Sequence, residues 1–121
     1  MLKGLRTAKY NVTDLDAARR WYSEVLGKQP YFDEPFYVGF NVGGFELGLD
    51  PDMTGVTPGS GHAAYWAVDN IERAHERLIG LGAAPREAIQ DVGGGIKIAS
   101  VTDPFGNVLG IIENPVFRIE E

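Results

Sequence analysis

The sequence repeats itself once, and this repeat constrains the fold more than any single residue does. The matching segments lie about 55 residues apart: Val12–Ala18 with Val68–Ala74, Leu26-Gly27 with Leu81-Gly82, and Leu47-Gly48-Leu49 with Leu109-Gly110-Ile111. A sequence that repeats at such a spacing consists of copies of one supersecondary unit. We therefore predict two modules of the same topology, each with one helix on one face of a small sheet. Two such sheets, brought together by their other faces, would enclose a shared cavity.

The first copy has the pattern of a β-α-β-β-β unit. Apolar positions with helical spacing follow an N-cap at Thr13-Asp14 and end at Gly27, which is typical of a helix and its left-handed stop. Proline and a glycine pair separate the runs with strand character after the helix. The predicted strands are residues 5–12, 29–33, 37–42 and 45–50.

The second copy follows a connector at 51–61 that is rich in Gly, Pro, Ser and Thr and is predicted to be a linker. The turn signal Asp103-Pro104-Phe105-Gly106 lies between two β-rich runs and predicts a hairpin over 96–112. A helix capped by Asp69-Asn70 and stopped by Gly82 precedes it, with predicted strands at 62–68 and 85–92. We predict one domain over 1–121, with module one at about 3–50 and module two at about 62–115.

Composition limits the classes of function. The chain has 121 residues, a net charge of −6 and no cysteine, which excludes disulfides and thiolate chemistry. Its basic residues are scattered, whereas a nucleic-acid surface needs a basic stripe, so we predict no nucleic-acid partner. No apolar run approaches the roughly 20 residues that span a bilayer, and the N-terminus lacks the apolar core of a signal peptide. We predict a cytoplasmic protein that does not associate with membranes.

Three motifs resemble the vicinal oxygen chelate superfamily, which includes glyoxalase I, bleomycin and fosfomycin resistance proteins, and extradiol dioxygenases. They are V-x-D-L-D-A-A-x-x-W-Y-x-x-V-L-G at 12–27, Y-W-A-V-D-N-I-E-R-A-H-E-R-L-x-x-L-G-A at 65–83 and D-P-F-G-N-V-L-G-I-I-E at 103–113. The resemblance implies an α+β fold of paired βαβββ modules that form a cupped mixed sheet with helices outside. It also implies a homodimer.

Metal-dependent members of this superfamily hold a divalent ion with four side chains, one on each of four strands. Lined up by the Val-x-Asp motifs, these positions fall on Thr7, Glu46, Ala63 and Gly110. Of these four residues, only Glu46 is of a type that usually binds such an ion, since these ions take His, Glu, Gln or similar donors. His62 adjoins the third position, but an offset of one residue turns a strand side chain to the opposite face unless a bulge intervenes. We therefore predict no metal and no other cofactor.

The face of the sheet that carries Glu46 also offers other chemistry. Glu46 and Asp50 share it at period two, so a desolvated pair could do acid–base work; the alternative is that Asp50 only caps the following loop. Lys9 is a candidate partner for Glu46. Tyr65 lies either in a pocket or in the core. The predicted ligand-binding residues are Thr7, Lys9, Glu46, Ala63, Tyr65 and Gly110.

These observations predict a small-molecule binding protein of the glyoxalase/bleomycin resistance type without a catalytic metal. Its partners would be a small organic ligand and a second copy of the chain, and the acidic balance favours a cationic ligand. The alternative is a lyase, isomerase or dioxygenase-like enzyme with a divalent metal held by Glu46 and His62. A third possibility is an accessory domain whose cup is filled by its own side chains.

Overall fold

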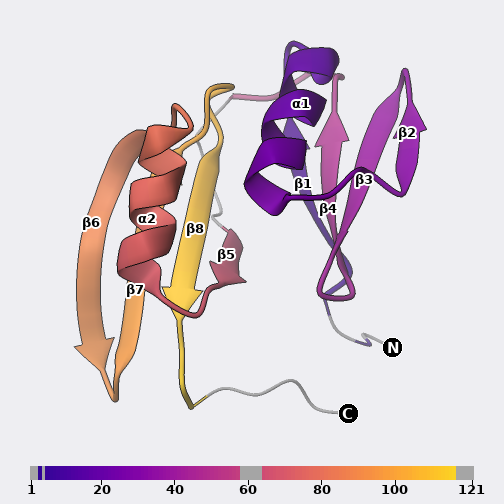
Figure 1. Cartoon of the computed structure of the whole chain (residues 1–121). Coiled ribbons are helices and arrows are strands. Elements are labelled where there is room, and N and C mark those ends of the chain that lie inside the picture. Colours follow the sequence, from indigo (N-terminus) through magenta and orange to yellow (C-terminus); the bar gives the residue numbers. More distant parts are fainter. Residues whose placement is uncertain (1–2, 4, 58–63, 117–121) are drawn as a thin grey trace. The chain divides into compact units, whose positions relative to one another are not determined.

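The computed structural model describes residue 3 and residues 5–57 and 64–116 (Figure 1). The chain divides into two compact units, Met1–Pro58 and Gly59–Glu121, and each is described by itself. Module one lies in the first unit and module two in the second. In both, a helix covers one face of a four-stranded sheet.

Module one has the element order β-α-β-β-β that the sequence predicts. Its elements are β1 (Thr7–Asn11), α1 (Leu15–Leu26), β2 (Phe32–Glu34), β3 (Tyr37–Val42) and β4 (Phe45–Asp50). The strands lie in the order β1-β4-β3-β2, with β1 parallel to β4 and the other pairs antiparallel. Gly43 and Gly44, both with positive φ, make the two-residue turn that joins β3 to β4.

Helix α1 forms where the local sequence supplies both of its ends. The Asp14 carboxylate accepts a hydrogen bond from the backbone N–H of Ala17 at 3.0 Å, which satisfies one of the free donors of the first turn. Gly27 adopts the left-handed conformation (φ 65°) at the other end. Between these ends the helix packs against the sheet, and its Ala18 and Tyr22 are fully buried.

Module two repeats this construction. Its elements are β5 (Ala64–Ala67), α2 (Ile71–Gly80), β6 (Ala84–Gly93), β7 (Ile96–Thr102) and β8 (Val108–Glu113), with strand order β5-β8-β7-β6. The side chain of Asn70 caps α2 by accepting from the N–H of Arg73 at 3.0 Å. Asp103, nearly fully buried, accepts from the N–H groups of Phe105 (2.9 Å) and Asn107 (2.8 Å) and so fixes the turn of the predicted hairpin. The α+β fold with paired βαβββ modules is confirmed.

The strand register defines which residues of the two modules correspond. Lys9 pairs with Gly48, and Tyr65 pairs with Gly110. The backbone N–H of Val12 donates to Asp50, and that of Val68 donates to Ile112, both at 2.9 Å. Gly48 therefore corresponds to Gly110, and the counterpart of Glu46 is Val108. This agrees with the repeat, which matches Gly48 with Gly110, and differs from the alignment of the metal-ligand positions, which gave Glu46 and Gly110 equivalent roles.

The predicted strand bounds need three corrections. Pairing in the first strand begins at Thr7 rather than Leu5, and the second strand covers 32–34 rather than 29–33. The second difference has a physical cause, because Pro30 has no N–H to donate to a ladder. The third concerns the strand expected from His62, whose first two residues lie outside the described part of the chain; its described part is Ala64–Ala67. Helix α2 ends at Gly80, two residues before Gly82.

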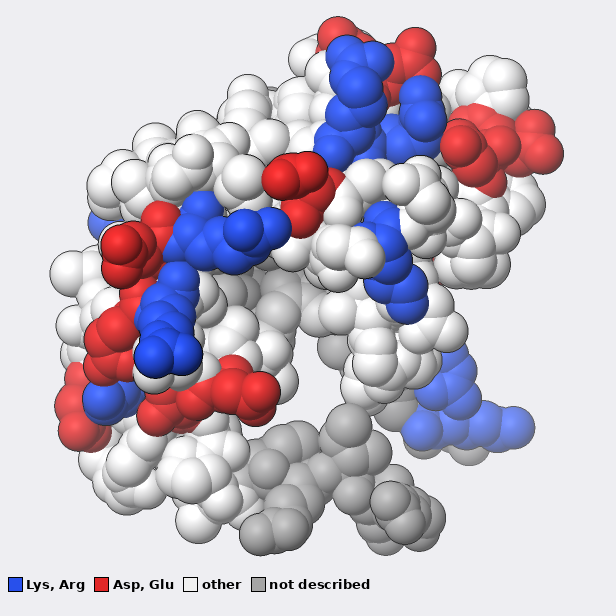
Figure 2. Space-filling view, in the orientation of Figure 1, with Lys and Arg blue, Asp and Glu red and all other residues white. Residues whose placement is uncertain are grey.

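The helix-covered face of each sheet carries the core. The largest fully buried side chains come from these faces and from the helices: Tyr22, Phe40, Leu47, Leu49 and Ile71. Outside this core, Figure 2 shows lysine and arginine side chains interspersed with aspartate and glutamate side chains rather than gathered in a stripe. No helix in the described part of the chain combines the length and apolar character that crossing a membrane requires.

Candidate functional site

The face of module one opposite α1 is polar, and Glu46 lies on it near the start of β4. Because paired residues of neighbouring strands share a face, Thr7 on β1 and Asn41 on β3 flank Glu46 on β4. We call this surface the open face of module one; its members are Thr7, Lys9, Asn11, Tyr37, Gly39, Asn41, Glu46, Gly48 and Asp50. The prediction that Glu46 and Asp50 share a face is confirmed.

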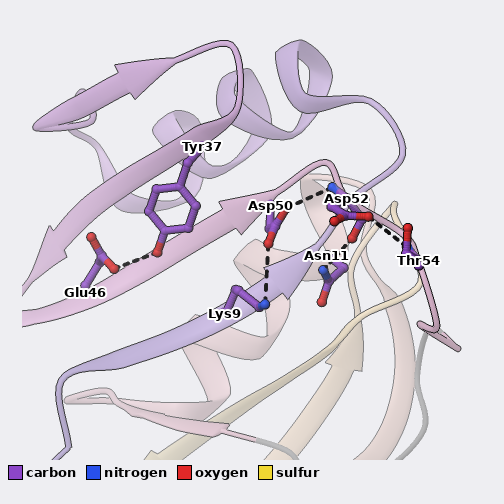
Figure 3. A network of polar contacts seen from close by, with 7 residues as sticks. All are labelled: Lys9, Asn11, Tyr37, Glu46, Asp50, Asp52 and Thr54. Carbon is purple, nitrogen blue, oxygen red and sulfur yellow. Dashed lines mark hydrogen bonds and ion pairs between the residues drawn. The ribbon is translucent and has the colours of Figure 1, made fainter.

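Three hydroxyl groups donate hydrogen bonds to the Glu46 carboxylate. Thr7 Oγ1 donates to Oε1 at 2.9 Å. The Tyr37 hydroxyl donates to the same oxygen at 2.6 Å, as Figure 3 shows. The Tyr31 hydroxyl donates to Oε2. Bonds to an ionised acceptor are the strong ones among hydrogen bonds, so this set favours the charged form of the carboxyl group.

Two glycines make room for this arrangement. Gly39 on β3 pairs with Gly48 on β4. A Cβ added at Gly48 would come within 1.9 Å of the Tyr37 hydroxyl, and one added at Gly39 would lie 2.7 Å from Glu46 Oε2 and 3.1 Å from the Tyr31 ring. The missing side chains therefore let the two rings lie across the sheet and reach the carboxylate.

The pKa values in this cluster follow from its contacts. Partial burial works to raise the pKa of Glu46, but the hydrogen bonds from Tyr31, Tyr37 and Thr7 outweigh it and hold that pKa below its usual range. Burial and the hydrogen bond from Tyr37 to Glu46 raise the pKa of Tyr37. The hydrogen bond that Tyr31 itself donates to Glu46 is the main cause that raises the pKa of Tyr31. Glu46 is thus a carboxylate and both phenols keep their protons at neutral pH.

A cavity of about 260 Å³ lies beside this cluster. Its lining comes entirely from module one: Arg6, Thr7, Tyr31, Asn41, Gly44, Phe45 and Glu46. It brings together the Glu46 carboxylate, the Arg6 side chain, two aromatic rings and an amide, so it offers polar and apolar contacts to a small ligand.

A second hollow, of about 730 Å³, lies at the N-terminal end of α1. Its lining includes Asp14, Asp16, Asp33 and Glu34 with Arg19, and it holds none of the predicted site residues. Arg19 lies 3.3 Å from Asp16 and 3.8 Å from Asp33, so it offsets part of the negative charge there. We assign no role to this hollow.

Lys9 does not pair with Glu46 as predicted. Its Nζ lies 3.4 Å from Asp50 Oδ2 (Figure 3). Lys9 stands opposite Gly48, midway between the two carboxylates, and Glu46 is already satisfied by hydroxyl groups. Asp50 also accepts from the N–H of Asp52 at 2.8 Å, so it caps the following loop as the alternative expects, but its pair with Lys9 shows that capping is not its only contact.

Of the predicted site residues in module two, Tyr65 and Gly110 are described and lie together, whereas Ala63 and His62 lie outside the described residues. A Cβ at Gly110 would come within 2.6 Å of the Ala64 carbonyl oxygen and 2.7 Å of Tyr65 Cδ1, so the Tyr65 ring covers this glycine. Tyr65 itself is exposed at the edge of its sheet.

The described donors do not fit the divalent ion that the superfamily resemblance implies. Among residues 3, 5–57 and 64–116, no three His, Cys, Asp or Glu side chains are grouped so that they could hold a metal. The groups that converge on Glu46 are protonated hydroxyls that donate to it, and Gly110 offers no side chain. We therefore derive no step through a metal.

Tyr31 is the site residue that the sequence analysis missed. It lies in the segment 29–33 predicted to be strand, but the structure begins β2 at Phe32, so strand alternation does not place the Tyr31 side chain. Its backbone N–H donates to the Gly39 carbonyl at 3.0 Å, which holds its ring next to Glu46. The signal available in the sequence was an aromatic residue directly after Pro30.

Comparison with known proteins places these modules among relatives. Residues 4–111 match the family described as the Glyoxalase/Bleomycin resistance protein/Dioxygenase superfamily. No curated protein is similar enough to count as a match.

Solved structures share the fold. A glyoxalase-related enzyme from Fulvimarina pelagi is 25% identical, with a TM-score of 0.77 over 98% of this chain and 94% of its own. A lactoylglutathione lyase from Agrobacterium tumefaciens is 20% identical, with a TM-score of 0.77 over 99% of this chain and 100% of its own. A glyoxalase/bleomycin resistance protein/dioxygenase family enzyme from Burkholderia phytofirmans PsJN is 20% identical, with a TM-score of 0.75 over 88% and 95%.

Proposed function

Because this chain belongs to the Glyoxalase/Bleomycin resistance protein/Dioxygenase superfamily, we propose that it is a small-molecule binding protein that works without a catalytic metal. The ligand lies in the cavity beside Glu46 on the open face of module one. The observation that carries the proposal is the Glu46 carboxylate, which is held in its charged form by three hydroxyl donors and lines that cavity.

The contacts of Glu46 favour binding over catalysis by this residue. A general base works best when its pKa is near the operating pH, and the hydroxyl donors hold the pKa of Glu46 below even its usual range. As an anchor, however, an ionised carboxylate at a cavity wall attracts a cationic group or a strong donor. The rings of Tyr31 and Phe45 offer apolar area for the rest of the ligand, at about 25 cal/mol per Å² buried.

The first test measures metal in the purified protein and its affinity for added nickel, zinc, manganese and iron(II) ions. We expect no bound metal, and titrations that are the same for wild type and Glu46→Gln. The alternative, a metal-dependent enzyme, would be supported if the wild-type protein binds about one ion per chain and both Glu46→Gln and His62→Ala lose it. His75→Ala is the matched control, since His75 lies on helix α2 of module two.

The second test screens cationic, neutral and anionic small molecules by ligand-detected NMR. We expect binders among the cations, with binding reduced at least about tenfold in Glu46→Gln, the order of one charge-assisted hydrogen bond. A protein that binds none of the three classes, or whose binding is unaffected by Glu46→Gln, would contradict the proposal.

A cytoplasmic homodimer belongs to the same proposal and is supported by the superfamily resemblance and the absence of cysteine. Size-exclusion chromatography with light scattering measures the assembly directly. A mass of twice 13.2 kDa is expected at micromolar concentration, and a monomer there would contradict the dimer.

A further inference from the structure

Among the three hydroxyls on Glu46, the one from Tyr31 differs from the other two in its setting. Tyr37 is part-buried in β3 with its ring across Gly48, and Thr7 is fixed in β1. Tyr31 precedes β2 outside any strand, and 65% of its surface is exposed. The Tyr31 hydroxyl can therefore replace its hydrogen bond to Glu46 with one to water at small cost. The Tyr37 hydroxyl is part-buried, so leaving Glu46 would cost it an acceptor that water does not easily replace.

The two carboxylate oxygens also differ in what remains open. Oε1 accepts from both Thr7 and Tyr37 and so has both of its lone pairs engaged. Oε2 accepts from Tyr31 and lies near Gly39, where an added Cβ would be 2.7 Å from Oε2 and 3.1 Å from the Tyr31 ring. Because Tyr31 and Glu46 both line the cavity, a donor that arrives through the cavity meets Oε2 where the Tyr31 hydroxyl now is.

We infer that Tyr31 is the specificity-determining residue of this site and that the ligand is a protonated amine whose N–H group replaces the Tyr31 hydroxyl on Glu46 Oε2. An ammonium group supplies the charge and the several donors that a phenol lacks, so the exchange is favourable. The released Tyr31 ring stays next to the cavity, where its face can lie against the cation. This inference rests on the proposed function and names the ligand class for the same site.

The test uses phenethylammonium as the probe, with 2-phenylethanol as its neutral counterpart, and measures affinity by calorimetry on the full-length protein. Tyr31→Phe keeps the ring and removes the competing hydroxyl, so we expect phenethylammonium to bind about three- to tenfold more tightly than to wild type, the net worth of one hydrogen bond. Tyr37→Phe is the matched variant and should bind it more weakly, because Glu46 loses a fixed donor. The neutral probe should bind wild type at least about tenfold more weakly than the cation.

A second readout follows the exchange itself. The Cζ chemical shift of Tyr31 should change as phenethylammonium is added to wild-type protein, and that of Tyr37 should stay near its starting value. This measurement needs no variant and so does not depend on the folding of one.

The outcomes distinguish failure of the inference about Tyr31 from failure of the proposed function. If wild type binds neutral or anionic molecules but not phenethylammonium, small-molecule binding survives and the inference about Tyr31 and the amine fails. If Tyr31→Phe binds the probe no better than wild type, or both tyrosine variants bind it equally weakly, Tyr31 is a structural residue and the inference also fails. If no small molecule binds at all, the proposed function fails with it.

Discussion

The two modules share one backbone design but differ in the chemistry of their open faces. Gly48 and Gly110 occupy the same register position, and in each module a tyrosine ring lies across this glycine. At five register positions around the glycine, module one carries the more polar residue, whereas Ser100 and Thr102 keep polar groups on the same face of module two. The pairs that show it are Glu46 with Val108, Asp50 with Ile112, Tyr37 with Ile98, Lys9 with Tyr65, and Asn11 with Ala67.

This difference shows which features belong to the fold and which to a site. The cap, the helix stop and the strand glycine recur in both modules, so they serve construction. A carboxylate with three hydroxyl donors is found in module one, and the register gives module two an isoleucine and a valine at the corresponding places. A charged group on a sheet face is costly unless it is solvated, paired or used, so its presence on one of two otherwise matched faces indicates function.

The strongest test of the shared design substitutes alanine for each of the two glycines. Gly110→Ala should lower the free energy of unfolding by about 2–3 kcal/mol, because the new Cβ would meet the Ala64 carbonyl oxygen of a neighbouring strand. Gly48→Ala should cost about 1 kcal/mol, because its Cβ meets the far end of the Tyr37 side chain, which can shift only by weakening its hydrogen bond to Glu46. Urea denaturation measures both, and an equal or reversed order would contradict this account of the two glycines.

Two variants exchange the residue types of the Glu46 and Val108 positions, and each should lower the free energy of unfolding. Val108→Glu places a carboxylate opposite Thr102 on a face where isoleucine replaces the Tyr37 hydroxyl donor, and it should cost about 1–2 kcal/mol. Glu46→Val leaves the part-buried Tyr37 hydroxyl without its acceptor and should cost about 1 kcal/mol. Denaturant midpoints of the two variants give the answer; a stabilised Val108→Glu would mean that module two can also accommodate a charge.

The stability of the protein should depend on pH through Glu46. Its pKa is lower in the folded state than the usual value of about 4.3, so its stabilising contribution is present above that value and is lost as the pH falls through the folded pKa. Because the group is partly exposed, the contribution should be below about 1 kcal/mol. Unfolding free energies at pH 7 and pH 3 should converge for wild type and Glu46→Gln on acidification. A difference that grows at low pH would have the wrong sign.

The smallest effects should come from the exposed ion pairs. Lys9→Met removes the 3.4 Å pair with Asp50 in module one, and Lys97→Met removes the 2.9 Å pair with Glu72 in module two. Each should change stability by less than about 0.5 kcal/mol, since exposed pairs contribute little. Thermal unfolding in low and high salt measures this, and a loss above about 1 kcal/mol at Lys9 would give this pair a larger part in the site than we assign.

Most of the fold could be predicted from the sequence, because the repeat, the caps and the glycine turns are local signals. The strands at 37–42 and 45–50 agree with the structure at both ends. The shared face of Glu46 and Asp50 followed from period two alone. The partners of Glu46 did not follow, because a face holds several groups within reach and the choice depends on which set of contacts has the lowest free energy.

Lys9 and Tyr31 illustrate this limit in opposite ways. Strand alternation correctly predicts the face on which Lys9 lies. Lys9 stands between the carboxylates of Glu46 and Asp50, however, and the register alone does not decide which of the two it pairs with. Tyr31 lies outside every strand, so no periodicity could place its ring, and its position depends on the backbone bond to Gly39. The residues of a site that come from loops are those that the sequence pattern leaves open.

The central claim is that small-molecule chemistry belongs to the open face of module one and not to its counterpart in module two. Mapping backbone amide shifts while phenethylammonium is added tests this most directly. The account predicts that the changes concentrate at Thr7, Asn41 and Glu46, with Ser100 and Gly110 unaffected. Changes that concentrate at Tyr65 and Gly110 instead would contradict it.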